Sequence, residues 1–211
     1  MSLLTHARVK RLALLSCGVL LALINTANAA DVVMVEETWE LRVATTDSNS
    51  TAPQVATAIS PTSDVDALHA VFELNHQSVP NWAPGGMHLQ MWEGEVPLET
   101  RKHPNGNVMS SGQEVVTWKQ TMSLSNGTLK FEVDDGNSDT WGKFGGQGYL
   151  RKSVDSALTN LNGYDPDLSV ENSGVTYAGN RVTKLVLKQV RIVGSNGSEY
   201  VDTTERIAHE N

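Results

Sequence analysis

Alternation of apolar and polar residues is the feature that most constrains the fold of this chain. Segments 87–92, 116–124 and 129–134 place apolar side chains at every second position, except at Gln120, with polar residues between most of them. A period of two puts one set of side chains on a buried face and the other on a wet face. These segments therefore predict half-buried β-strands.

A fourth alternating segment covers 33–43 and contains one exception. One face of this segment carries the apolar residues Val33, Val35, Trp39, Leu41 and Val43. On the same face, Glu37 lies between Val35 and Trp39. Tryptophans on the apolar face of a strand belong to the core, so we assign Trp39 and Trp118 to the core.

Further strands are expected at 55–59, 68–74, 149–151 and 181–193. Asn126-Gly127 predicts a type I′ hairpin turn, because both residues tolerate a positive φ. One short helix is expected where Val154, Leu158 and Leu161 recur at helical spacing, with Ser153 as its N-cap. The polar segment 202–211 is expected to fray.

Many short strands with frequent turn residues predict an all-β fold, an antiparallel β-sandwich of the jelly-roll or concanavalin-like kind with at most one short helix. A closed barrel is the main alternative. In layout the chain resembles jelly-roll and concanavalin-like sandwiches that bind or process polysaccharides. The Glu-x-Asp-x-x-Glu strand of sandwich glucanases and the Arg- and Gln-x-His-bearing strands of sandwich alginate lyases are absent, so no functional residue is carried over.

The N-terminus has the pattern of a secretory signal peptide. Arg8, Lys10 and Arg11 precede the apolar run 12–24, and Ala27-Asn28-Ala29 forms a cleavage site. A membrane anchor would need about 20 apolar residues, and lipidation at Cys17 would leave only a stub of the apolar run. We expect residues 1–29 to be the signal peptide and 30–211 a single secreted or otherwise extracytoplasmic domain.

Cleavage after Ala29 would leave 13 basic and 24 acidic residues, a formal charge of −11, and no cysteine. Such a charge disfavours nucleic acid and anionic lipid as partners, and no insertion into a membrane is expected after cleavage. Without cysteine, neither disulfides nor thiolate chemistry is available. The core must then hold the fold unaided.

Trp92 is the centre of a candidate ligand platform. It shares its strand face with His88 and Gln90, and an indole beside an imidazole and an amide suits the stacking of a sugar ring. Trp82 and Trp141 lie in glycine-containing loops, where binding residues concentrate. The alternative is that these tryptophans pack against neighbouring loops.

Two further sets of polar residues are candidates for chemistry. Asp135, Asn137 and Asp139 alternate in an acidic run, for which a solvated turn is the default interpretation; the alternative is a structural calcium site. Glu93 and Glu95 are candidate catalytic carboxylates, since alternate residues of a strand are about 7 Å apart. Gly94 and Pro97 point instead to a strand end.

The sequence therefore favours an exported, non-catalytic ligand-binding domain whose partner is an extracellular glycan. A structural or adhesive protein of the cell surface, which binds another surface protein, is the first alternative. A glycan-cleaving enzyme is the second.

Overall fold

The computed structural model describes residues 30–45, 53–75, 86–102, 109, 112–146 and 148–211. The predicted signal peptide 1–29 and Trp82 lie outside these residues. In the part described, no helix has the length and apolar character needed to span a membrane.

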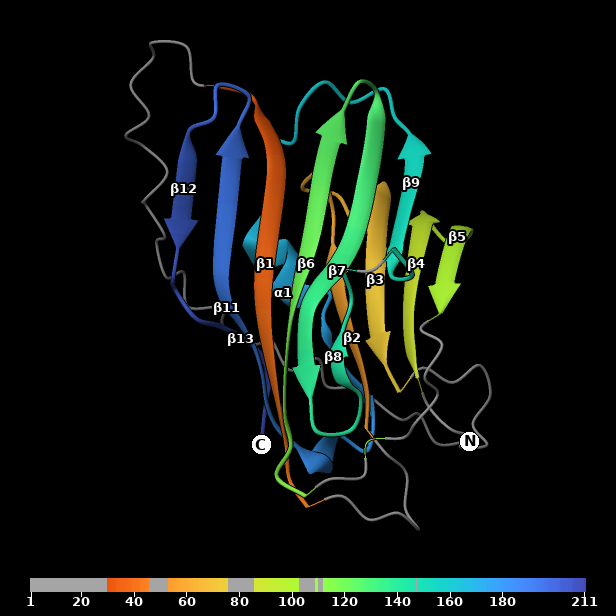
Figure 1. The fold of residues 1–211 in the computed structure, drawn as a ribbon, viewed down its shortest axis with the longest axis vertical. Coiled ribbons are helices and arrows are strands. Elements are labelled where there is room, and N and C mark those ends of the chain that lie inside the picture. Colours follow the sequence, from red (N-terminus) through yellow and green to blue (C-terminus); the bar gives the residue numbers. More distant parts are fainter. Residues whose placement is uncertain (1–29, 46–52, 76–85, 103–108, 110–111, 147) are drawn as a thin grey trace, which may run out of the picture.

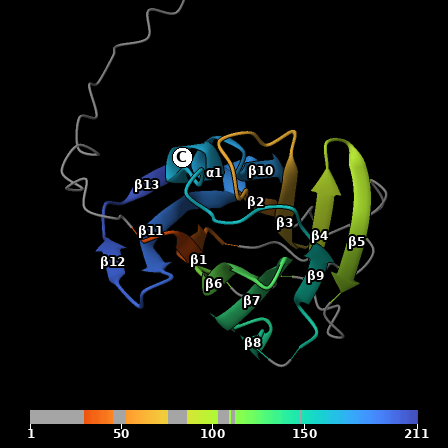
Figure 2. The same ribbon diagram turned by 90° about the horizontal axis from the view of Figure 1, so that it is seen from above.

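The described residues form two antiparallel sheets that pack face to face (Figures 1 and 2). The larger sheet has the order β12 (Glu199–Asp202), β11 (Val182–Gly194), β1 (Val32–Val43), β6 (Val115–Ser125), β7 (Thr128–Ser138) and β8 (Gly142–Phe144). In addition, β13 (Arg206–Glu210) pairs with β11, and β9 (Arg151–Asp155) pairs with β7.

The smaller sheet has the order β10 (Gly174–Tyr177), β2 (Gln54–Ile59), β3 (Leu68–Leu74), β4 (Met87–Glu93) and β5 (Val96–Lys102). A short helix, α1 (Pro166–Glu171), and a 3-10 turn, η1 (Gly179–Arg181), lie between β9 and β11 in the chain. The predicted antiparallel β-sandwich with one short helix is confirmed.

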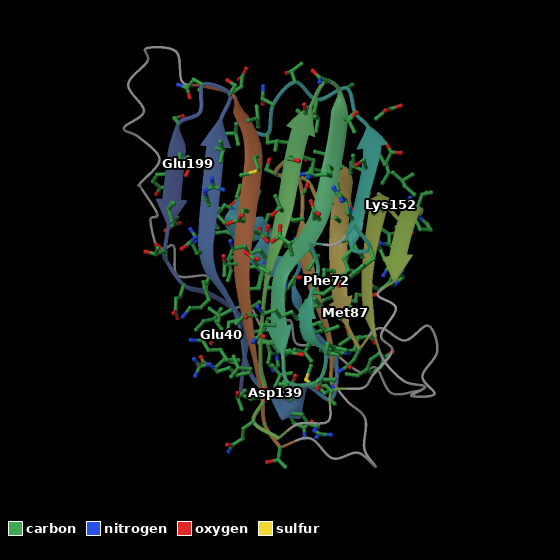
Figure 3. The ribbon with its side chains drawn as sticks, in the orientation of Figure 1. Glu40, Phe72, Met87, Asp139, Lys152 and Glu199 are labelled. Atoms are coloured by element: carbon green, nitrogen blue, oxygen red, sulfur yellow. The ribbon has the colours of Figure 1, made fainter. Side chains whose placement is uncertain are left out.

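The core lies between the two sheets. Trp39 and Trp118 face each other across β1 and β6 and stack, with ring centroids 6.4 Å apart and planes 9° apart. Phe72 of the smaller sheet meets Trp118 edge-on at 5.7 Å. Phe72 and Met87, labelled in Figure 3, are buried in this core, whereas Glu199 is exposed. The core assignment of both tryptophans is confirmed.

The predicted facing of β4 is also confirmed. Met87, Leu89 and Met91 are buried, and Trp92 on the opposite parity stays half-buried. Asn126 and Gly127 join β6 to β7 with φ of 50° and 73°, the two positive values that a type I′ turn requires.

Two local predictions are wrong. Ser153 and Val154 lie in β9, because this segment pairs with β7, and the helix lies instead at Pro166–Glu171. Its start has an Asp165 N-cap that accepts from the amide of Asp167, followed by proline at the first helical position. The C-terminus does not fray: β13 pairs with β11 from Leu187 to Lys184.

Candidate functional site

The outer face of the larger sheet carries two rows of polar side chains across four strands. One row places Arg191, Glu36, Thr121 and Glu132 opposite one another on β11, β1, β6 and β7. The next row is made by Gln189, Thr38, Lys119 and Asp134 on the same strands. Side chains directly opposite on neighbouring strands are about 5 Å apart at Cβ, so each residue of a row lies close to the next residue of that row. We call this cluster the outer-face site.

Lys119 lies at the centre of the outer-face site. Its Nζ is 3.4 Å from Oε1 of Glu36 and 3.0 Å from Oδ2 of Asp135. Glu36 also lies 3.9 Å from the guanidinium of Arg191. Glu36 therefore forms ion pairs with two cations.

A β-bulge brings two consecutive acids to the outer-face site. Thr117 pairs with Asn137 and Lys119 with Asp134, so β7 carries one extra residue between these pairs. Asp135 takes a left-handed φ of 46° there. Bulges re-aim side chains and are common beside active sites. Here the bulge lets Asp134 and Asp135 both reach the Lys119 side of the sheet.

Two glycines bring the loop after β8 close to Asp134. A Cβ on Gly145 would lie 2.4 Å from the carbonyl oxygen of Val133, and one on Gly146 would lie 3.5 Å from Cβ of Asp134. The amide of Gly146 donates to that Val133 carbonyl. Only residues without side chains allow this close approach, which partly covers Asp134.

Asp134 is the most perturbed carboxyl of the outer-face site. Burial raises its pKa to about 6, helped by the negative charges of Asp135, Glu36 and Glu132, and Lys119 opposes the rise. Its Oδ1 is buried and has no hydrogen-bond partner among the described residues, and the same holds for the hydroxyl of Thr121. A half-buried carboxyl of this kind, set among ionised groups, indicates acid–base chemistry.

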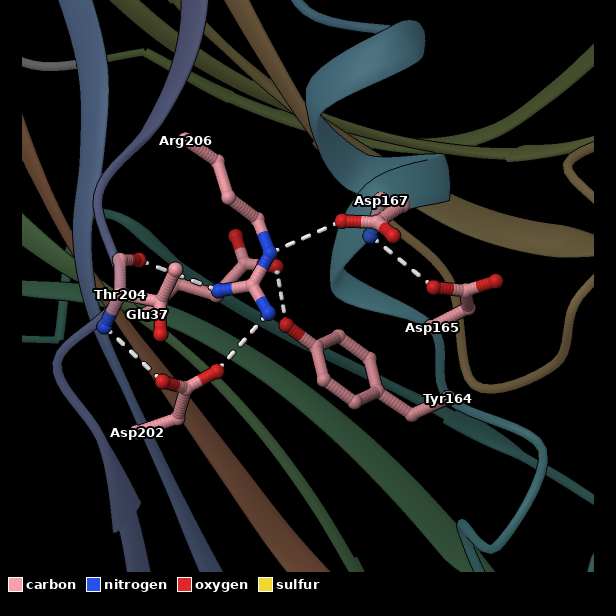
Figure 4. Close-up of polar contacts among 7 residues, drawn as sticks. All are labelled: Glu37, Tyr164, Asp165, Asp167, Asp202, Thr204 and Arg206. Carbon is pink, nitrogen blue, oxygen red and sulfur yellow. Dashed lines mark hydrogen bonds and ion pairs between the residues drawn. The ribbon is translucent and has the colours of Figure 1, made fainter. Parts of the chain in front are cut away.

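A second polar cluster lies on the inner side of β1, at Glu37 (Figure 4). Its carboxylate is fully buried and accepts hydrogen bonds from Trp39 Nε1 and the Tyr164 hydroxyl, both at 2.8 Å. Burial raises the pKa of Glu37 to about 7, although these donors and the charge of Arg206 act to lower it. Because the group has no exposed surface, we do not assign a substrate to it.

Some residues of the predicted ligand platform are buried and others are partly exposed. His88 and Gln90 lie on one face of β4 with Trp92, as expected, and Gln90 Nε2 donates to Glu73 at 2.6 Å. His88 is buried, with Nδ1 3.6 Å from the same carboxylate.

Trp141 belongs to the core rather than to an open loop. It is buried and packs edge-on against Phe144 at 6.4 Å, while its amide donates to the hydroxyl of Ser138. The platform therefore keeps Gln90 and Trp92 as its partly accessible members among the described residues.

Glu93 and Glu95 are both exposed at the turn between β4 and β5. The acidic run is part of β7 and the turn after it: Asp135 pairs with Lys119, and Asn137 and Asp139 are exposed. Within the described ranges, no three His, Cys, Asp or Glu side chains are placed to hold a metal ion. Calcium at Asp135, Asn137 and Asp139 stays a prediction.

Sequence reasoning missed the members of the outer-face site, namely Glu36, Lys119, Thr121, Glu132 and Asp134. Each occupies the polar parity of its strand, which was visible. Their meeting depends on the order β11-β1-β6-β7, which brings together residues about a hundred positions apart in the chain. Glu37 is visible in the sequence, because it is the one acidic residue on the otherwise apolar face of its segment.

No family model and no curated sequence matches the chain. Among solved structures, it is similar to a scytalidoglutamic peptidase with a peptide-based transition-state analogue, at 11% identity and a TM-score of 0.35, over 85% of this chain and 83% of that one. It is also similar to SCP-B, an eqolisin-family peptidase in complex with the tripeptide Ala-Ile-His, at 13% identity and a TM-score of 0.37, over 84% and 82%.

These solved structures are peptidases, matched at TM-scores of 0.31 to 0.37. The expectation of a non-catalytic glycan-binding domain is corrected on the placement of its own side chains. The side chains supply the physical reason: His88 and Trp141 are buried, and the amide of Gln90 is bound to Glu73. Its two alternatives, the adhesive protein and the glycan-cleaving enzyme, are not retained. Glu93 and Glu95 are exposed at a turn.

Proposed function

We propose that the protein is a carboxylate-dependent hydrolase that cleaves peptide bonds at the outer-face site. The observation that carries the proposal is Asp134, a half-buried carboxyl with one unpartnered oxygen, which lies opposite Lys119, the ion-pair partner of Glu36. Carboxyl groups whose environments push their pKa values apart can divide the roles of acid and base between them.

The division of roles follows from the neighbours of each group. Glu36, which is ion-paired with Lys119 and Arg191, can accept a proton from water as the water oxygen adds to the substrate carbonyl carbon. Burial keeps Asp134 protonated, so it can donate that proton to the amide nitrogen as the C–N bond breaks. The ammonium of Lys119 can stabilise the negative charge that develops on the carbonyl oxygen.

Cleavage of a peptide library by the domain, followed by mass spectrometry between pH 4 and 8, tests this function. We expect cleavage at mildly acidic pH that declines above pH 6, because Asp134 then loses the proton it must donate. Asp134→Asn and Glu36→Gln should each lower the rate about 100-fold or more, the usual effect of removing a general acid or base.

Matched controls exist on the same sheet. Glu40 lies on the outer side of β1 and pairs with Arg42, and Asp155 is exposed on β9. Glu40→Gln and Asp155→Asn should retain the full rate. If no peptide is cleaved at any pH, or if Asp134→Asn cleaves as well as the unchanged protein, the proposed function is wrong.

We also propose that this reaction takes place outside the cytoplasm, on the basis of the signal-peptide pattern in residues 1–29. Mass spectrometry of the exported protein should find a mature N-terminus at Ala30. Full-length protein retained in the cytoplasm would contradict this location.

A further inference from the structure

The Glu37 cluster joins segments that are far apart in the chain. Glu37 lies on β1, Tyr164 precedes α1, and Arg206 belongs to β13. Arg206 in turn bonds Asp167 of α1 and Asp202 of β12, both at 2.8 Å, and the carbonyl of Thr204 at 3.1 Å. Figure 4 shows these groups gathered around the guanidinium, between α1 and the C-terminal strands. The cluster therefore holds α1, β12 and β13 together at one side of β1.

We propose that Glu37 is a proton-controlled latch: its neutral carboxyl lets α1 and the β12–β13 segment close over β1, and loss of the proton loosens them. This inference does not depend on the proposed hydrolase activity, because it concerns a group on the opposite face of β1 from the outer-face site.

The charges that face Glu37 are few. Tyr164 approaches from the segment before α1 and Arg206 from β13, while β6 places the neutral Gln120 opposite Glu37, where its side-chain oxygen accepts from Thr57 of β2. Arg206 is the positive charge that acts on Glu37, and it is already paired with Asp167 and Asp202. Its charge is thus shared with two other carboxylates.

Ionisation of Glu37 is therefore costly in the closed structure. Burial outweighs Trp39, Tyr164 and Arg206, and raises the pKa of Glu37 to about 7 from an ordinary value of 4.5. Above pH 7 the carboxylate gains by contact with water.

Two routes could admit water to Glu37. Separating β1 from β6 or β11 would break long strand pairings, whereas α1 is six residues long and β12 and β13 are four and five residues long. Short elements at the edge of a sheet open at lower free energy than its central strands. We therefore expect α1 and the β12–β13 segment to be the parts that open.

Hydrogen exchange of the intact domain at pH 5 and pH 8, corrected for the intrinsic pH dependence of exchange, tests the latch. We expect protection in 166–171 and 199–210 to fall about 70-fold between these pH values, because the carboxyl of Glu37 titrates with a pKa near 4.5 when exposed and near 7 when buried, and opening becomes about tenfold more favourable with each pH unit between those values. The β6–β7 hairpin should keep its protection and serves as the internal reference. In Glu37→Gln, whose amide cannot ionise, the two segments should stay protected at both pH values.

Two variants separate a titrating latch from a purely structural contact, because they should move the midpoint of the pH dependence in opposite directions. Tyr164→Phe removes a donor to the carboxylate and should raise the midpoint. Asp202→Asn frees part of the Arg206 charge and should lower it. Glu40→Gln, on the other face of β1, should leave the midpoint unchanged.

Protection in 166–171 and 199–210 that does not change with pH in the unchanged protein would overturn the latch. So would an equal loss of protection in Glu37→Gln. Neither result would bear on peptide cleavage, which is measured separately at Asp134.

Discussion

Two adjacent residues of β1 meet opposite environments because successive side chains of a strand point to opposite faces. Glu36 points outward, where Lys119 and Arg191 stabilise its charge. Glu37 points inward, where it is fully buried and its pKa rises to about 7. The same residue type is thus ion-paired on one face of the strand and fully buried on the other.

The raised pKa of Glu37 makes stability depend on pH. The folded chain holds a proton on Glu37 that the unfolded chain releases near pH 4.5, so this contribution is complete below pH 4.5 and is lost as pH rises through 7. Glu37→Gln should therefore raise the free energy of unfolding by about 3 kcal/mol at pH 8 and change it little at pH 4.

Urea unfolding of both proteins at several pH values measures this difference, with Glu40→Gln as the control on the other face of the strand. A constant difference between Glu37→Gln and the unchanged protein across pH 4–8 would contradict the raised pKa.

At the scale of elements, the sequence predicts the β6–β7 turn but not the β-bulge in β7. Asn126-Gly127 has a recognised signature and forms the predicted turn. The bulge at Asp135 has none, because Asp can occupy a turn, a loop or a bulged strand. The C-terminal strand was mistaken for a frayed end because its residues are mostly polar, and its pairing with β11 depends on a neighbour that sequence alone does not reveal.

The glycine loop beside Asp134 offers a test at this scale. Gly145 has φ of 80°, and its added Cβ would meet the Val133 carbonyl at 2.4 Å, so Gly145→Ala should destabilise the domain by about 2–5 kcal/mol. Gly142 also has a positive φ, 66°, but open space around it, so Gly142→Ala should cost about 1 kcal/mol.

Urea unfolding compares the two glycine variants directly. An equal loss in the free energy of unfolding for Gly145→Ala and Gly142→Ala would contradict the close approach of this loop to β7.

At the scale of the whole molecule, one core connects the two sheets. Phe72 from the smaller sheet contacts both Trp118 of β6 and Phe144 of β8, the latter at 6.3 Å. Fold class, the facing of β4 and the core tryptophans followed from periodicity, since period two is a local property. The outer-face site did not, because it is assembled by strand order.

Because Phe72 contacts aromatic rings of the opposite sheet, we expect the two sheets to unfold together. Phe72→Ala should lower the free energy of unfolding by about 3–5 kcal/mol, the usual cost of deleting a buried aromatic ring. Tyr200→Ala, at a side chain 59% exposed, should change it by about 0.5 kcal/mol or less. Circular dichroism and tryptophan fluorescence should report one coincident transition, and two separate transitions would contradict the shared core.

The most direct test of the account is an NMR titration of the side-chain carboxyl carbons in the ¹³C-labelled domain. We expect midpoints of about 6 for Asp134 and about 7 for Glu37, one on each face of the larger sheet. Titration of both groups at their ordinary values of 3.8 and 4.5 would contradict it.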